Sequence, residues 1–86
     1  MDKIIKNISE KVANEYFYEK EYAEEEGASS SAVCGYAYSA AKKLAQQEGG
    51  VAEYLDSQYE GDYPTVIYKF PDGSSCYLSY SGCYTY

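Results

Sequence analysis

The chain has no arginine, histidine or tryptophan among its 86 residues, and these absences exclude whole classes of function. Histidine is the commonest metal ligand and the side chain that moves protons near neutral pH. Binding to a phosphate backbone needs cations, yet seven lysines stand against fourteen Asp and Glu and leave a net charge of −7. We therefore expect neither an enzyme nor direct binding to nucleic acid.

Long hydrophobic runs are also missing. No segment approaches the roughly 18 apolar residues of a membrane span, and the first residues lack a signal-peptide core. We therefore expect a cytoplasmic protein with no membrane partner. Cys34, Cys76 and Cys83 are an odd number of cysteines without zinc-like spacing, so we expect reduced thiols, no metal and no other cofactor.

Tyrosine is present in excess, at 13 of 86 positions. A core of this size cannot absorb so many large rings, so several of them must be exposed. The tyrosines expected in or around the core are Tyr16, Tyr54, Tyr59, Tyr68 and Tyr80. Those expected to be exposed are Tyr18, Tyr22, Tyr36, Tyr63, Tyr84 and Tyr86.

The first segment of the chain has a helical period. Its apolar side chains recur at steps of three and four, which predicts a helix over residues 2–24. The residues of this apolar stripe are Ile5, Ile8, Val12 and Tyr16. Beyond the stripe the sequence becomes acidic but continues to favour a helix.

Two further helices are predicted to follow. A run of serines suits the N-cap of a helix over residues 31–47, and a pair of glycines ends it. The predicted buried face of this helix consists of Val33, Ala37, Ala40, Ala41 and Leu44. Val51, Leu55 and Tyr59 then recur every four residues. We therefore predict a third, short helix over residues 51–59.

Toward the C-terminus the apolar period becomes two, which is typical of strands. Pro, Asp and Gly at 71–73 suit a tight turn between a strand at 64–70 and one at 74–80. This turn pairs Tyr68 with Cys76. The side chains of the two strands that share the core face are then Val66, Tyr68, Phe70, Cys76, Leu78 and Tyr80.

A third strand is predicted at 83–86, after a two-residue turn at 81–82. In this register Tyr80 lies opposite Cys83, and Cys83 lies roughly 13 Å along the strands from Cys76, too far for a disulfide. The segments together predict an α+β protein. Two or three N-terminal helices pack on one face of a three-stranded antiparallel β-meander, and the single domain spans the whole chain, 1–86.

Carboxylates cluster on the outer edge of the predicted third helix. Glu53, Asp56 and Glu60 follow one another at steps of three and four, without a lysine at either spacing. Glu48 and Asp62 extend this acidic stretch. Each pair of like charges so placed costs roughly 0.3 kcal/mol, which favours a surface that meets a cationic partner. An ordinary solvated face, kept negative for solubility, is the alternative.

A second acidic block, Glu24, Glu25 and Glu26, lies near the end of the first helix and has the same two interpretations. Tyr59 and Tyr63 accompany the carboxylates of the first block. Exposed tyrosine supplies a large contact area at low entropic cost, and rings among carboxylates suit a basic surface. We therefore expect these ten residues to bind a basic protein or ribonucleoprotein complex.

In length, acidity, compact α+β layout and lack of a catalytic set, the chain resembles the small acidic inhibitors encoded by phages and mobile elements. These include anti-CRISPR proteins that mimic DNA, and the resemblance is one of type, without a shared motif. It implies a non-catalytic inhibitor, monomeric or dimeric, that occupies a basic nucleic-acid-binding groove of a defence complex in the host cytoplasm. The alternatives are an immunity-type, antitoxin-type or adaptor protein that neutralises a basic partner, and an accessory protein whose acidity keeps it soluble.

Overall fold

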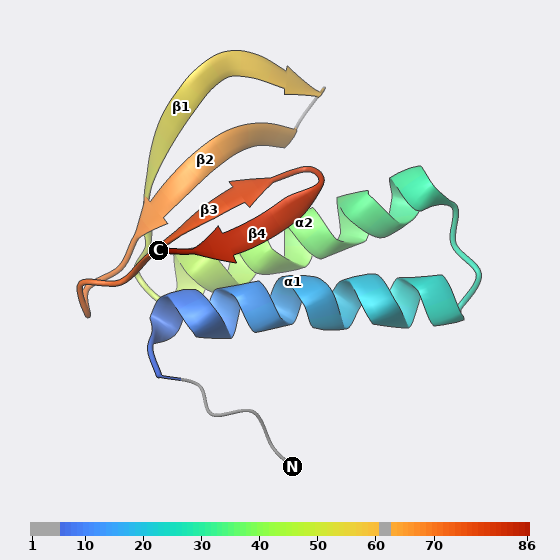
Figure 1. The fold of residues 1–86 in the computed structure, drawn as a ribbon, viewed down its shortest axis with the longest axis horizontal. Coiled ribbons are helices and arrows are strands. Elements are labelled where there is room, and N and C mark those ends of the chain that lie inside the picture. Colours follow the sequence, from blue (N-terminus) through green and yellow to red (C-terminus); the bar gives the residue numbers. More distant parts are fainter. Residues whose placement is uncertain (1–5, 61–62) are drawn as a thin grey trace.

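The computed structural model describes the backbone of residues 6–60 and 63–86, and the side chains of 6–55 and 63–86. The described elements are α1 (Ile8–Glu25), α2 (Ser30–Gln47), β1 (Val51–Glu60), β2 (Tyr63–Lys69), β3 (Ser75–Ser79) and β4 (Gly82–Thr85). The two helices form an antiparallel hairpin on one face of a four-stranded antiparallel sheet of order β1-β2-β3-β4 (Figure 1). The α+β class is therefore confirmed, with two helices and four strands.

Helix α1 begins later than predicted because Asn7 caps it. The Asn7 side-chain oxygen accepts hydrogen bonds from the Glu10 N–H at 2.9 Å and from the Ser9 hydroxyl at 2.6 Å. Such a cap satisfies backbone donors that a helix leaves free in its first turn. Val12 and Tyr16 are fully buried, as predicted, whereas Ile5 of the same stripe lies outside the described residues.

Helix α2 begins and ends close to the predicted bounds. The Ser29 hydroxyl accepts the Ala32 N–H at 3.3 Å, and Gly49 follows the helix at φ +82°. Small buried side chains, among them Ala37 and Ala41, let α2 approach α1 closely. Tyr38 is also buried, and its hydroxyl donates to the Pro64 carbonyl at 2.6 Å, which ties α2 to β2.

The predicted third helix is wrong, because residues 51–60 form strand β1. A spacing of four residues is compatible with a helical face and is also a multiple of two, so the apolar pattern fits both structures. Pairing with β2 decides between them, with Val51 opposite Lys69 and Tyr54 opposite Val66. The register then shifts between Tyr54 and Tyr59, where the strand is irregular. The sheet consequently has four strands instead of three.

The hairpin of β2 and β3 has the predicted register. Tyr68 lies opposite Cys76, and the Phe70 N–H donates to the Ser74 carbonyl at 2.9 Å. Gly73 closes the turn at φ +87°, in the left-handed region that side chains with a Cβ rarely adopt. Local turn chemistry therefore sets this pairing.

The second predicted turn is one residue too late, and the predicted register of the strands that it joins is wrong by two residues. Ser79 pairs with Gly82, so the turn lies at residues 80–81 and Cys83 faces Leu78. The turn is connected to α2, because the Tyr80 hydroxyl donates to the Ser31 carbonyl at 2.6 Å. A shift of two residues keeps every side chain on its predicted face, but it brings Cys83 diagonally next to Cys76. The predicted separation of these cysteines is thus too long.

The core lies between the helix layer and the sheet. Helix α1 contacts β3 and β4, and α2 contacts β2 and β3. Tyr54 shares the helix-facing side of the sheet with Val66 but is 65% exposed, because β1 curves away past the helices (Figure 1). The prediction of Tyr54 as a core residue is therefore wrong. The buried residues of the core are Val12, Ala13, Tyr16, Ala37, Tyr38, Ala41, Ala45, Val66, Tyr68, Phe70, Cys76, Leu78 and Cys83.

Most of the other tyrosines lie as predicted. Tyr16 and Tyr68 are buried, and the confirmed exposed rings are Tyr18, Tyr22, Tyr36, Tyr84 and Tyr86. Tyr63 is half-buried instead of exposed, since its ring packs edge-on against Tyr38 with centroids 5.2 Å apart. The Tyr59 side chain lies outside the described residues.

Candidate functional site

The helical edge that was predicted to align Glu53, Asp56 and Glu60 does not exist, because all three residues belong to strand β1. Side chains alternate between the two faces of a strand, so steps of three and four no longer define one line of charge. Glu53 shares the face of the sheet that points away from the helices with Ile67. The side chains of Asp56 and Glu60, and the whole of Asp62, lie outside the described residues.

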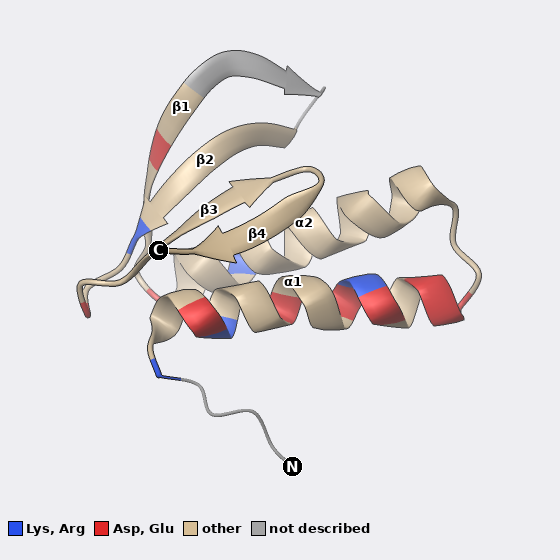
Figure 2. Ribbon diagram, viewed as in Figure 1, with Lys and Arg blue, Asp and Glu red and all other residues tan. Residues whose placement is uncertain are grey.

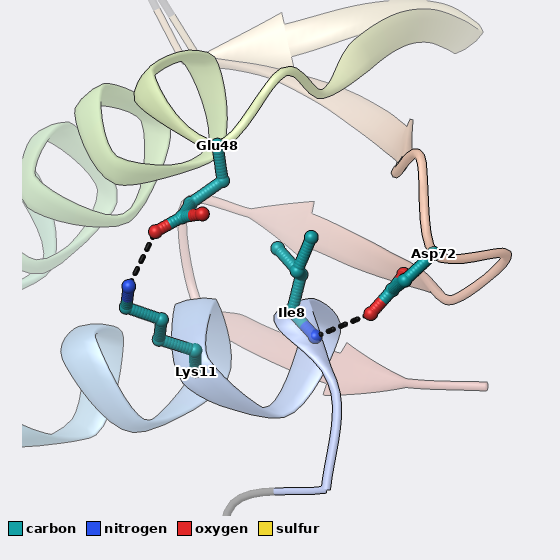
Figure 3. A network of polar contacts seen from close by, with 4 residues as sticks. All are labelled: Ile8, Lys11, Glu48 and Asp72. Carbon is teal, nitrogen blue, oxygen red and sulfur yellow. Dashed lines mark hydrogen bonds and ion pairs between the residues drawn. The ribbon is translucent and has the colours of Figure 1, made fainter.

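Two of the predicted carboxylates pair with lysines from other elements. Glu53 lies 3.2 Å from the Lys69 ammonium, and both side chains are more than half exposed. Glu48 pairs with Lys11 where the end of α2 meets the start of α1 (Figure 3). Exposed pairs of this kind add little stability, but each lysine cancels the local negative charge. The acidic stretch around α2 and β1 is therefore weaker than the sequence indicates.

Among the residues that the structure describes, negative charge is densest at the C-terminal end of α1, as Figure 2 shows. Five glutamates and one lysine leave a net charge of −4 over residues 19–26. Glu21, Glu24 and Glu25 are exposed, and we call these three side chains the outer acidic face. Glu26 caps the helix and is also exposed. The predicted block at 24–26 thus lies on the surface.

This placement opposes the helix dipole. The C-terminal end of a helix carries partial negative charge, which favours lysine or arginine in the last turn. Helix α1 has no basic residue in its last turn. Repulsion continues toward the middle of the helix, where partial burial, followed by the neighbouring charge of Glu19, raises the pKa of Glu15. The distribution of charge therefore costs stability at the end of α1.

Beside the outer acidic face, α1 and α2 enclose a shallow hollow of about 280 Å³. Tyr22 and Tyr36, one from each helix, line it and are both more than half exposed. The hollow, which we call the tyrosine hollow, is lined by Glu19, Tyr22, Ala23, Glu26, Ala28 and Tyr36. Sequence reasoning predicts both rings as exposed but does not bring them together, because their pairing depends on how the helices are aligned.

The buried polar groups of the described residues suit structural roles. Burial raises the pKa of Tyr16 and of Tyr38 to about 12, so both phenols stay protonated and donate hydrogen bonds. The pKa of the Cys83 thiol is raised first by its hydrogen bond to Cys76 and second by burial.

In the part of the chain that the structure describes, no group of three or more Cys, Asp and Glu side chains can hold a metal ion. Neither described helix is long and apolar enough to cross a membrane.

Comparisons of the chain with protein-family models, with curated proteins and with solved structures find no match.

Proposed function

We propose that the chain is a non-catalytic binding protein of the anti-CRISPR DNA-mimic type. In this proposal helix α1 docks into a basic nucleic-acid-binding groove of a host defence complex. The observation that carries the proposal is the acidic last turn of α1, where carboxylates lie against the negative end of the helix dipole. The negative charge at this end of α1 does not stabilise the fold. Binding to a cationic partner is a reason for the charge to be there.

The density of charge along α1 supports mimicry of a phosphate array. Residues 10–26 contain seven glutamates and two lysines, so they carry a net charge of −5. Sixteen helical steps span about 24 Å, which gives roughly one net charge per 5 Å. A single strand of DNA carries one per ~3.4 Å of helix axis, so the two densities are of the same order. A groove that tracks phosphates can therefore accept this helix.

The exposed rings of α1 favour a second candidate function. Tyr18 and Tyr22 are 65% and 53% exposed among the carboxylates, and tyrosine is enriched where proteins contact proteins. An immunity-type or adaptor protein that neutralises a basic partner would use the same surface without replacing a nucleic acid. Competition with nucleic acid separates the two functions.

The test measures displacement of DNA from purified, guide-loaded CRISPR effector complexes, whose channels are positively charged. A fluorescent target duplex is bound to each complex, and its anisotropy is followed as the protein is added. We expect the native protein to release the duplex from at least one complex, with an inhibition constant that rises steeply with salt.

A charge variant and a matched control make this test specific. Changing Glu24 and Glu25 to Gln raises the net charge from −7 to −5, and it should weaken displacement at least about tenfold. Changing Glu48 and Glu53, which lie outside α1, to Gln gives the same net charge and should preserve displacement. Equal activity of the two variants would show that α1 is not the docking element. Binding to a complex without release of its duplex would favour the immunity-type function.

A further inference from the structure

We propose that the tyrosine hollow receives one arginine side chain of the basic partner. The inference rests on the proposed function, because it names the chemistry with which the same end of α1 recognises a basic surface. It starts from the shape of the hollow, which is apolar at its base and acidic at its rim.

The base of the hollow is built from small side chains. Ala23 is 6% exposed, and Ala28 is half-buried beside it after the turn between the helices. The Ala28 N–H donates to the Ala23 carbonyl at 3.1 Å, which holds the turn against α1. Alanine has no side-chain rotamer with which to fill the space above it. The base of the hollow therefore has a fixed shape.

The walls of the hollow are aromatic and come from both helices. Tyr22 of α1 and Tyr36 of α2 are 53% and 59% exposed. Large rings left this open on a small protein are typical of contact surfaces. The face of an aromatic ring carries negative electrostatic potential, which attracts a guanidinium or ammonium group within ~6 Å.

The rim of the hollow is negative. Glu19 lies three residues before Tyr22, and Glu26, the C-cap of α1, lies four residues after it, so both carboxylates lie on the same side of the helix as the ring. The negative end of the α1 dipole adds to the same potential. None of the six lining residues is a cation. The charge of the hollow is therefore complementary to a cationic group.

Arginine fits this combination better than lysine. Its planar guanidinium stacks on aromatic faces, hydrogen-bonds a carboxylate at two points, and loses its hydration more readily than an ammonium group. The volume of about 280 Å³ lies just below the size of drug-binding pockets, which suits one inserted side chain. Basic grooves that bind nucleic acid present arginine at their surface.

The test is an NMR titration of the isolated protein with N-acetyl-arginine amide. The probes for comparison are the lysine analogue and the citrulline analogue, which keeps the shape of arginine but has no charge. We expect saturable shifts of the Ala23 and Ala28 amide signals, at least about threefold tighter for arginine than for lysine, and absent for citrulline.

Matched variants assign the binding to the hollow. Tyr36→Leu and Glu26→Gln should each weaken arginine binding at least about threefold. Tyr18→Leu and Glu53→Gln remove an exposed ring and an exposed carboxylate outside the hollow, and they should leave arginine binding unchanged. Circular dichroism checks that each variant is folded. Equal binding of lysine, equal binding of citrulline, or an unchanged affinity in Tyr36→Leu would overturn the proposal.

The DNA-displacement test separates this proposal from the proposed function. If the hollow binds arginine but the protein displaces DNA from none of the complexes, the arginine site is supported and the proposed nucleic-acid mimicry is wrong. Displacement that survives undiminished in Tyr36→Leu would support the mimicry and overturn the role of the hollow.

Discussion

Asp72 shows how one side chain in a turn connects the two layers of the fold. Its carboxylate accepts the Ile8 N–H at 2.9 Å and the Ser74 N–H at 2.9 Å, so the β2–β3 turn meets the start of α1 (Figure 3). The Ser9 N–H donates to the Ser74 hydroxyl at 3.1 Å beside it. A negative charge at this end of α1 also suits the helix dipole.

These contacts predict a pH dependence of stability. Hydrogen bonds from the Ser74 hydroxyl, and next from the Ile8 N–H, lower the pKa of Asp72 below its ordinary 3.8. The stabilisation by Asp72 is therefore full above the unfolded-state pKa and is lost as the pH falls through the folded-state pKa. We expect Asp72→Asn to be less stable than the native protein near neutral pH, with the difference shrinking below pH 3.8.

Urea unfolding of both proteins, near neutral pH and in acid, measures this difference. Glu53→Gln is the control, since it removes a carboxylate from an exposed surface pair and should cost less at either pH. A difference between Asp72→Asn and the native protein that stays constant into acid would mean that the carboxylate charge does not stabilise the turn.

At the scale of the element, α1 combines a well-capped start with an end that opposes its own dipole. Asn7 caps the first turn, and Glu10 lies where negative charge is favourable. At the other end the last turn has no cation to offset Glu24 and Glu25. The fold tolerates this end because the burial of Val12, Tyr16 and Ala23 against α2 and the sheet holds the helix in place.

Changing Glu24 and Glu25 to Lys should therefore stabilise the protein while it weakens binding to the basic partner. Each change should contribute roughly 0.5 kcal/mol to the free energy of unfolding, measured with urea at low ionic strength. The control, Glu10→Lys, places the same charge at the opposite end and should destabilise the helix. If the double variant is less stable than the native protein, the acidic end of α1 has a structural role that the dipole argument omits.

At the scale of the whole molecule, the two layers determine which thiols are accessible. Cys76 and Cys83 lie on the helix-facing side of the sheet and are 0% and 1% exposed, whereas Cys34 on α2 is half-buried. All three are free cysteines in the structure. The fold should thus protect two thiols and leave one reactive.

Titration with a thiol reagent tests this arrangement. We expect three thiols per chain under denaturing, non-reducing conditions, and one rapidly reacting thiol in the native protein. Cys34→Ser should abolish the rapid reaction, which assigns it. A total of one thiol would instead reveal a disulfide, and the diagonal neighbours Cys76 and Cys83 would be the pair to map.

The sequence by itself determined the features whose causes are local. Serines and glycines set the bounds of α2 within a residue, and the Pro-Asp-Gly turn at 71–73 set the register of β2 and β3. The apolar stripe of α1 identified Val12 and Tyr16 as core residues. Each of these signals acts through hydrogen bonds or side chains within a few residues of itself.

Only the tertiary structure decided the features that need a distant partner. A helix satisfies its backbone hydrogen bonds within the segment, but a strand needs a neighbour. Residues 51–60, whose apolar spacing fits both, therefore became a strand only through pairing with β2. Because the segment is a strand, Glu53, Asp56 and Glu60 do not form the single line of carboxylates that a helix would give. In turn, the alignment of α1 with α2 brought together Tyr22 and Tyr36, which lie on different helices and meet only when those helices pack.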